Sequence, residues 1–335
     1  MQFNKNLKIA ITGGAGYIGS FTVKYLKDLG FDNLVVLDNF STGHKQACYA
    51  RHHDVNLLDR NKLNDIFEKE QFDAVIHFAS LIVVPHSMSE PYVYFYHNFN
   101  TSLNLLEVMK DNEVQHIVFS STCAVYGTPA SFPIHEDELV KPDSVYAETK
   151  LMIERIIQWY GKIYGLQYAL LRYFNACGAA SDSSNGEMHE PETHLIPSSI
   201  INLLQGQSIE IYGNDYETPD KTCIRDYIHV NDLASAHHLA LKHIMEKNTS
   251  DIFNLGIGAG KSNLEVVEAI LQIAGKYNVE GHYVFRERRP GDVPILYADN
   301  TKAKQVLGWE PKHTDITNIV EEAFKWHSKK FKSLS

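Results

Sequence analysis

The chain has 335 residues, enough for one large or two medium domains, and its 44% hydrophobic and 21% charged residues are ordinary for a globular protein. The net charge of −10, with no basic cluster, argues against nucleic acid and anionic membranes as partners. Four scattered cysteines, a polar N-terminal segment and the lack of any apolar run near roughly 20 residues predict a cytoplasmic protein without disulfides, signal peptide or membrane span.

The first predicted elements are an apolar strand over 7–12, a glycine-rich loop and a helix over 17–29 that ends at Gly30. Glycines allow a tight turn and a close approach of the backbone, and a helix N-terminus offers amide groups to a pyrophosphate. This order of strand, loop and helix therefore predicts a dinucleotide site. The loop reads Gly13-Gly14-Ala15-Gly16-Tyr17-Ile18-Gly19.

A second strand, predicted over 34–37, ends at Asp38, which is 19 residues beyond Gly19. A carboxylate at this distance accepts hydrogen bonds from the adenine ribose hydroxyls and repels a 2′-phosphate. Asn39 beside it is not a phosphate binder, so the pair favours NAD over NADP. The alternative is that Asp38 is only a turn residue at the end of a strand.

Strands and helices continue to alternate, which predicts an α/β fold with a doubly wound parallel (Rossmann) sheet. In such sheets ligands bind beyond the carboxyl ends of the strands, where Ser120, Ser121, Thr122 and Asn175 are expected. The predicted helices are 59–70, 91–111 and 143–164, and the predicted strands are 74–79, 116–121 and 168–173.

After Asn175 the sequence changes character, with a loop over 176–192 and short segments separated by Gly213, Pro219 and Gly291. Helices are predicted near 194–205, 230–246, 262–275 and 314–331. We therefore expect a NAD-binding domain over 1–175, with returning segments near 224–256, and a smaller, discontinuous α/β substrate-binding domain over 176–335.

Tyr146 and Lys150 lie four residues apart in the helix predicted over 143–164, so their side chains share one face. A cation one turn from a phenol favours the phenolate, and this predicts a pKa for Tyr146 below the usual value of about 10. Such a tyrosine can exchange a proton with a sugar or alcohol hydroxyl. The alternative is an ordinary solvated helix face, because this spacing is common by chance.

The segment 189–194 contains His189, Glu190, Glu192 and His194, which suggests metal chemistry. Its spacing does not match the helical H-E-x-x-H pattern, and Pro191 would break such a helix. The sequence therefore predicts no metal site.

Taken together, these motifs resemble those of the extended short-chain dehydrogenase/reductases and, among them, the UDP-glucose 4-epimerase family. The resemblance extends over almost the whole chain, and so many motifs in one order are far more specific than any one of them. They are TGGAGYIG, Asp38-Asn39, HFAS, FSSTCAVYG, YAETK, LRYFNACGA, HLIP, IYGNDYETPDKTCIRDYIHV, NLGIG and RRPGD.

The resemblance implies a role for each matching residue. Tyr146 resembles the catalytic tyrosine, Lys150 its partner, and Thr122 the residue that binds the reacting hydroxyl. The implied cofactor contacts are Gly13, Gly16, Tyr17, Ile18, Gly19, Asp38, Asn39, Asp54, Val55, Phe78, Ala79, Ser80, Asn98, Ser120, Tyr146, Lys150, Tyr173 and Phe174. The implied nucleotide-sugar contacts are Thr122, Tyr146, Asn175, His194, Leu195, Tyr212, Arg225, Arg289, Asp292 and Leu296, with an aromatic ring on uracil and two arginines facing the pyrophosphate.

The reaction implied is the reversible inversion of C4 in UDP-glucose and UDP-galactose, through a transient 4-keto sugar and tightly bound NAD. The resemblance also implies a homodimer formed by a four-helix bundle from helices 91–111 and 143–164. Each of these helices carries an apolar stripe, which could instead face the subunit's own sheet. The stripes consist of Leu103, Leu106 and Met109 in the first helix and of Met152, Ile156, Trp159 and Ile163 in the second.

Some positions depart from the family pattern. Ile82 stands where some members have a lysine near the nicotinamide ribose, and His194 replaces an asparagine. Leu296 stands where some members have a tyrosine whose ring leaves no room for an N-acetyl group, which leaves UDP-GlcNAc and UDP-GalNAc open as further substrates. Tyr297 beside it could fill the same space. Cys123 is expected to be a buried, inert thiol.

Two rival functions share these motifs. A nucleotide-sugar 4,6-dehydratase needs an extra acid and base, and related dehydratases have Asp-Glu after the threonine, where this chain has Cys123-Ala124. A regulator that senses NAD without catalysis tends to lose the tyrosine or lysine, and this chain has both Tyr146 and Lys150.

Overall fold

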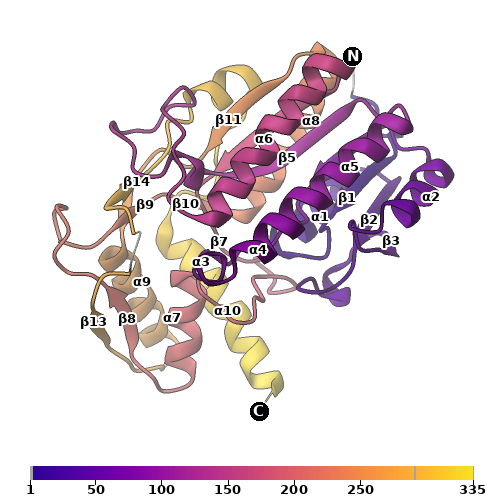
Figure 1. The fold of residues 1–335 in the computed structure, drawn as a ribbon. Coiled ribbons are helices and arrows are strands. Elements are labelled where there is room, and N and C mark those ends of the chain that lie inside the picture. The colour runs from indigo at the N-terminus through magenta and orange to yellow at the C-terminus, as the bar shows by residue number, and fades with distance from the viewer. Residues whose placement is uncertain (1–2, 290–291, 335) are drawn as a thin grey trace.

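The computed structural model describes residues 3–289 and 292–334, so Pro290 and Gly291 of the RRPGD motif lie outside the described residues. A parallel seven-stranded sheet forms the centre, in the order β11-β6-β5-β4-β1-β2-β3 (Figure 1). This order confirms the predicted doubly wound Rossmann sheet. The strands are β1 (Ile9–Thr12), β2 (Leu34–Asp38), β3 (Arg51–Asp54), β4 (Ala74–His77), β5 (His116–Thr122), β6 (Gln167–Tyr173) and β11 (Asp251–Leu255).

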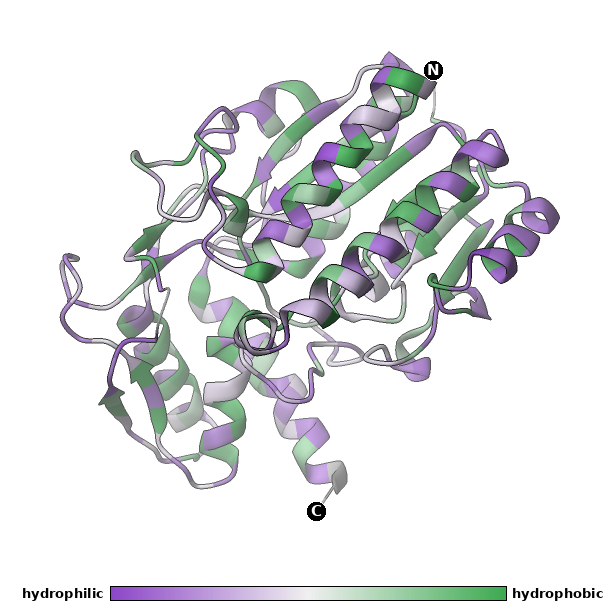
Figure 2. Ribbon diagram, viewed as in Figure 1, coloured by the Kyte–Doolittle hydropathy of each residue, from purple (hydrophilic) through white to green (hydrophobic). Residues whose placement is uncertain are grey.

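Helices cover both faces of this sheet, because its inner strands are apolar on both sides. The helices α1 (Tyr17–Asp28) and α8 (Val230–Lys247) pack on one face. The helices α2 (Arg60–Glu70), α5 (Asn100–Asp111) and α6 (Val145–Tyr164) pack on the other. Figure 2 shows the hydrophobic central strands between helices whose hydrophilic residues lie on their outer sides.

The helix predicted over 91–111 is not uniform. It consists of α4 (Pro91–Tyr94), a π-helical segment over Phe95–Phe99 and α5. The π-helical segment carries Asn98, which is buried. Insertions of this kind often occur at functional sites, and hydrophobic periodicity does not reveal them. The sequence also missed β3, whose residues are polar, and the short helix α3 (Val84–Ser89).

A separate hydrophobic core lies beside the carboxyl ends of the strands. It is formed by α7 (Leu195–Leu204), α9 (Asn263–Lys276) and α10 (Ile316–Leu334), with β8 (Ile209–Tyr212) paired to β13 (Tyr283–Arg286). Two small sheets accompany it: β7 (Asn175–Cys177) with β10 (Tyr227–His229), and β9 (Ile224–Arg225) between β12 (Lys261–Ser262) and β14 (Ile295–Leu296). Among the described residues, none of the helices is both long and apolar enough to cross a bilayer.

Candidate active site

The glycine loop after β1 has no room for a side chain at Gly13 or at Gly19, which lies in the first turn of α1. A Cβ atom at Gly13 would lie 2.6 Å from the backbone nitrogen of Ala79, and one at Gly19 would lie 2.3 Å from the carbonyl oxygen of Gly13. Gly13 also has a φ of 68°, which favours glycine. Helix α1 begins after Gly16 with no acidic residue in its first turn, so its amide groups remain suited to a phosphate.

Asp38 lies at the end of β2 and is held by the loops around it. Its Oδ2 accepts a hydrogen bond from the amide of Ala15 at 3.0 Å, and its Oδ1 accepts one from the amide of Phe40 at 2.8 Å. Asp54 lies opposite on β3, and the amide of Val55 donates to the carbonyl oxygen of Asp38 at 3.0 Å. The structure therefore brings the predicted ribose and adenine contacts together beside the glycine loop.

Asn98 connects the loop after β4 to the helix that carries Tyr146. Its Oδ1 accepts from the amide of Leu81 at 2.8 Å, and its Nδ2 donates to the carbonyl oxygen of Leu81 at 3.0 Å and to Oγ1 of Thr149 at 3.1 Å. The Thr149 hydroxyl in turn donates to the carbonyl oxygen of Tyr146 at 2.7 Å. These bonds fix the segment that follows Phe78 relative to the start of α6.

Tyr146, Lys150 and Thr122 meet at the carboxyl end of β5. Ser144 caps α6, its Oγ accepting from the amide of Ala147 at 3.2 Å, so Tyr146 lies in the first turn of the helix. The ammonium group of Lys150 lies 5.9 Å from the centre of the Tyr146 ring. The side chain of Thr122 lies close enough to the phenol of Tyr146 to lower its pKa. The predicted catalytic residues are thus assembled in one place.

The expected lowering of the Tyr146 pKa is wrong for the protein chain alone. Burial raises the pKa of Tyr146, the neighbouring Tyr173 raises it further, and the side chain of Thr122 opposes both. Burial also lowers the pKa of Lys150 to about 7, although Glu154 acts in the opposite direction. Desolvation disfavours the charged form of both groups, and the helical spacing gave no information about burial.

Two further residues contact this assembly, and the sequence gave no signal for either. His237 on α8 lies with its Nε2 2.9 Å from Oγ of Ser120, and its ring centre is 4.6 Å from that of Phe78. Ser87 on α3 accepts a hydrogen bond from the amide of Tyr146 at 3.1 Å. Both come from segments distant in the sequence, and neither belongs to a recognisable motif.

The predicted nucleotide-sugar residues form two neighbouring groups. In the first, the guanidinium carbon of Arg289 lies 3.9 Å from the centre of the Tyr212 ring. In the second, Arg225 on β9 lies 3.7 Å from a carboxylate oxygen of Asp292 and pairs in register with Leu296 on β14.

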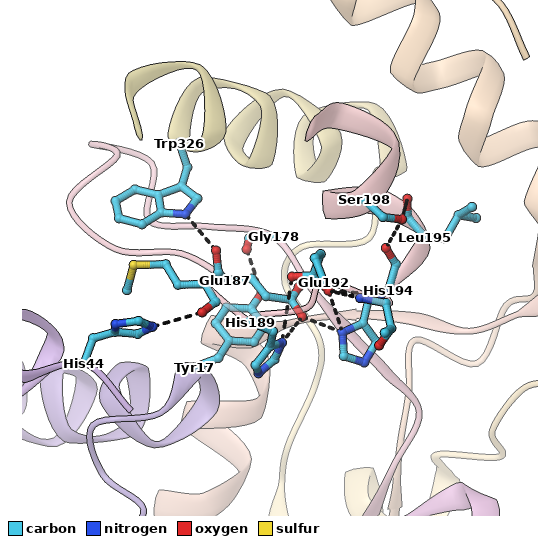
Figure 3. A network of polar contacts seen from close by, with 12 residues as sticks. Tyr17, His44, Gly178, Glu187, His189, Glu192, His194, Leu195, Ser198 and Trp326 are labelled. Atoms are coloured by element: carbon cyan, nitrogen blue, oxygen red, sulfur yellow. Dashed lines mark hydrogen bonds and ion pairs between the residues drawn. The ribbon is translucent and has the colours of Figure 1, made fainter. Parts of the chain in front are cut away.

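Three other predicted residues lie elsewhere. Asn175 donates its amide to the carbonyl oxygen of Asp226 at 2.9 Å, and Leu195 begins α7. The imidazole of His194 belongs to a separate polar cluster with Glu187, shown in Figure 3.

Tyr17 is one of the predicted cofactor contacts. Its hydroxyl donates to the carbonyl oxygen of Gly178 at 2.6 Å, so the phenol is engaged within the protein.

Cys123 follows Thr122 but is buried, and burial raises the pKa of its thiol to about 12. A thiol with such a pKa is protonated at neutral pH and is a poor nucleophile. The predicted burial of this thiol is confirmed, and its raised pKa is consistent with an inert side chain.

The chain matches the model of the NAD dependent epimerase/dehydratase family over residues 9–256. It is 44% identical over 324 residues to the UDP-glucose 4-epimerase of Lactobacillus helveticus, covering 96% of this chain and 97% of that protein.

Among solved structures, the UDP-glucose 4-epimerase of Brucella ovis in complex with NAD is 42% identical, with a TM-score of 0.90 over 95% of this chain and 97% of that one. The UDP-glucose 4-epimerase of Bifidobacterium longum in complex with NAD+ and UDP is 34% identical, with a TM-score of 0.88 over 96% and 98% of the two chains. The three relatives named above are UDP-glucose 4-epimerases that match this chain over nearly its full length. With its glycine loop, the carboxylate at the end of β2 and the Tyr146–Lys150 pair, this chain belongs to the NAD dependent epimerase/dehydratase family.

Proposed function

We propose that this protein is a UDP-glucose 4-epimerase that interconverts UDP-glucose and UDP-galactose by inverting C4. The observation that carries the proposal is the assembly of Tyr146, Lys150 and Thr122 at the carboxyl end of β5, which only β4 separates from β1 and its glycine loop. Full-length similarity to proteins of this activity supports the same conclusion.

The residues around the glycine loop fit NAD. The crowded glycines at 13 and 19, the free N-terminus of α1 and the Asp38 carboxylate correspond to the pyrophosphate and ribose positions of a dinucleotide. Held by these residues, NAD would supply a reversible hydride acceptor for C4 of the sugar. It is unchanged after each cycle, so it can remain bound to the protein.

The chain itself supplies proton transfer and position. Tyr146 takes the proton from O4 as the 4-keto sugar forms and returns it after the sugar turns over. Thr122 holds the reacting hydroxyl beside the phenol. Lys150 stabilises the phenolate when its ammonium group is charged. Because its pKa is about 7, Lys150 can gain or lose this charge near neutral pH.

Inversion requires the sugar to rotate while the nucleotide stays fixed. Arg225 and Arg289 are suited to the pyrophosphate, because a planar guanidinium pairs with two phosphate oxygens. Tyr212, already stacked with Arg289, offers an aromatic face to uracil. Anchoring by UDP leaves the sugar free to present either face.

Leu296, a smaller residue than the tyrosine of some family members, favours a broader substrate range that includes UDP-GlcNAc and UDP-GalNAc. Leu296 packs against the hydrophobic cluster that contains Phe174 and Cys123, and Cys123 directly follows Thr122 in the chain. Tyr297 does not fill the space instead, because its ring stacks on Phe132 with centres 5.9 Å apart.

The surface of α4 to α6 supports a homodimer formed by a four-helix bundle. Leu106 and Met109 of the predicted stripes are buried in the subunit's own core, so that part of the prediction is wrong. Trp159 and Ile163 are 56% and 61% exposed. Three aromatic residues before α5 are also exposed: Tyr92 and, about one helical turn after it, Phe95 and Tyr96. An exposed apolar face of this kind on neighbouring helices indicates a protein partner.

The predicted division into domains at residue 175 and a cytoplasmic location complete the proposal. The segment Asp251–Leu255 returns to the large sheet beside β6, which supports the returning segments near 224–256. All four cysteines are free, and three of them are buried, as suits a reducing compartment.

The test is conversion of UDP-galactose to UDP-glucose by the purified protein without added reductant. An epimerase gives UDP-glucose at equilibrium. A 4,6-dehydratase would instead give a 4-keto-6-deoxy sugar, and a regulator that only senses NAD would give no product. Either of the last two results would contradict the proposal.

A further inference from the structure

We propose that Glu187, His189, Glu192 and His194 form a binding site for a zinc ion. The four residues lie in the segment between β7 and α7, and they converge as Figure 3 shows. One ligand atom from each lies within 4.8 Å of all the others, an arrangement that no other group of these residue types shows in the described part of the chain.

The distances between these atoms suit a tetrahedral ion. Oε1 of Glu187 lies 2.9 Å from Nδ1 of His189 and 2.6 Å from Nδ1 of His194. Nδ1 of His194 lies 3.3 Å from Oε1 of Glu192, and Nδ1 of His189 lies 3.9 Å from Oε2 of Glu192. Zinc bonds to nitrogen and oxygen are about 2.0–2.2 Å, so the ligand atoms of a tetrahedral site lie roughly 3.3–3.6 Å apart. To reach that geometry, the Glu187 oxygen must move away from the two imidazole nitrogens, which lie 2.6 and 2.9 Å from it, and the Glu192 oxygen must approach Nδ1 of His189 from 3.9 Å.

A second observation points to a bound cation. The side chain of Glu192 is only 7% exposed. Its Oε1 accepts hydrogen bonds from the amides of Thr193 and His194 at 2.8 and 3.0 Å, whereas its Oε2 is buried and has no hydrogen-bond partner among the described residues. A buried carboxylate oxygen that lacks a donor is costly. A metal ion bound at this oxygen removes the cost.

Ion pairs between protonated histidines and the two glutamates explain fewer features of the cluster than a bound zinc ion does. Protonated histidines would satisfy Glu187, which lies between His189 and His194, but they leave Oε2 of Glu192 without a donor. A zinc ion binds both carboxylates and both imidazoles, balances two negative charges, and uses ligand types that it prefers.

The sequence predicted no metal site here, because its spacing was compared with that of a helical motif. The comparison with H-E-x-x-H assumed a helix, but these residues lie in a loop that ends where α7 begins. The cluster also contains a different carboxylate from the one that the sequence suggested. Glu190 is exposed and lies outside the cluster, whereas Glu187, three residues earlier, belongs to it.

The surroundings suggest a structural role. The indole of Trp326 on α10 donates to the carbonyl oxygen of Glu187 at 3.0 Å, and the ring of Tyr17 on α1 meets that of His189 edge-on. His194 leads directly into α7. Four protein ligands close the coordination sphere, which is typical of structural zinc. The ion would therefore fix three helices around the loop that follows β7.

The experiment measures zinc on the full-length protein without a histidine tag. Elemental analysis of protein purified from zinc-supplemented medium should find one zinc per chain, and the chelator-treated protein should rebind one equivalent in competition with a chromophoric chelator. Cobalt(II) should bind with the visible absorption of a tetrahedral complex. Zinc should also raise the melting temperature of the chelated protein.

Matched variants locate the site. In Glu192→Gln the amide oxygen still accepts from Thr193 and His194, but the anionic oxygen is lost. This variant and His189→Gln should bind zinc at least about 100-fold more weakly, because the loss of a mere supporting residue already costs 10- to 100-fold. Glu190→Gln, in the same loop but outside the cluster, should bind as the wild type does.

Two results would overturn the proposal. One is a wild-type protein that neither contains zinc nor takes it up at micromolar concentration. The other is equal zinc affinity in Glu192→Gln and Glu190→Gln. Circular dichroism melting of each variant separates loss of the ligand from loss of the fold, and the cobalt spectrum of the wild type needs no variant at all.

Discussion

The ammonium group of Lys150 donates a hydrogen bond to the carbonyl oxygen of Ser120 at 3.0 Å. This bond joins the first turns of α6 to the carboxyl end of β5, and it places Lys150 beneath the Tyr146 ring. Only 2% of Lys150 is exposed, so the side chain is held rather than solvated. The geometry of proton transfer therefore depends on the packing of α6 against the sheet.

Replacing Tyr146 by phenylalanine tests the proton carrier. Tyr146→Phe should lower kcat for UDP-galactose by about 10²-fold or more, which is the scale of general acid–base catalysis, while NAD stays bound. Steady-state kinetics and the nucleotide content of the purified variant provide the measurement. The exposed Tyr164 on the same helix is the control, and Tyr164→Phe should keep its turnover. Near-normal turnover in Tyr146→Phe would refute the assignment.

The cofactor preference rests on Asp38. Protein purified without added nucleotide should release NAD or NADH on denaturation, identified by mass spectrometry. Asp38→Asn removes the charge that repels a 2′-phosphate but keeps an oxygen that can accept from Ala15 or Phe40. The variant should therefore discriminate less against NADP. Recovery of NADP from the wild type would contradict this prediction.

Leu296 is expected to control access for N-acetylated sugars. Leu296→Tyr adds bulk against the hydrophobic cluster that contains Phe174 and Cys123, and overpacking of this kind typically costs about 1–3 kcal/mol. The ratio of kcat/KM for UDP-GalNAc to that for UDP-galactose should fall by roughly 10-fold or more in the variant. If the wild type does not use UDP-GalNAc, or if the ratio does not change, Leu296 is not the gate.

The exposed face of α6 predicts self-association. Light scattering at micromolar concentration should report twice the chain mass of 38.0 kDa. Trp159→Glu places a charge on the expected interface, where burial without a partner is costly, and should shift the population toward monomer. The exposed Arg155 on the same helix serves as the control site. A monomeric wild type would rule out the dimer.

Glu70 makes the free energy of unfolding depend on pH in the acidic range. Its carboxylate, which is buried, accepts hydrogen bonds from Arg51 at 2.8 Å and pairs with His53 at 2.8 Å, and the Arg51 bond lowers its pKa to about 2, below the ordinary value of 4.5. The unfolded state therefore binds more protons between pH 4.5 and 2. The stabilisation is fully present above pH 4.5 and is lost as pH falls through about 2.

The variant Glu70→Gln tests this dependence through urea unfolding at a series of pH values. The free energy of unfolding should differ most between wild type and variant above pH 4.5, and the difference should shrink toward pH 2. Glu68→Gln, exposed on the same helix, controls for loss of a carboxylate. A difference that stays constant over this range would show that the Arg51 pair is not formed.

The sequence by itself determined the local parts of this protein. The strand, glycine loop and helix around Gly13 and the carboxylate at Asp38 follow each other within one βαβ unit, so their spacing in the chain fixes their spacing in space. Tyr146 and Lys150 share a helix face for the same reason, since four residues make about one turn. The alternation of strands and helices likewise fixed the class of fold.

Only the tertiary structure decided the contacts between distant segments. His237 and Ser87 reach Ser120 and Tyr146 from other helices, and no local pattern marks them. Burial also reversed the expected shift in the pKa of Tyr146, because desolvation depends on everything packed around the phenol. The same holds for the cluster at Glu187, where a loop rather than a helix brings the ligand atoms together. Sequence spacing fixes geometry within one element, whereas side chains from different elements meet only where the packing of the whole chain places them.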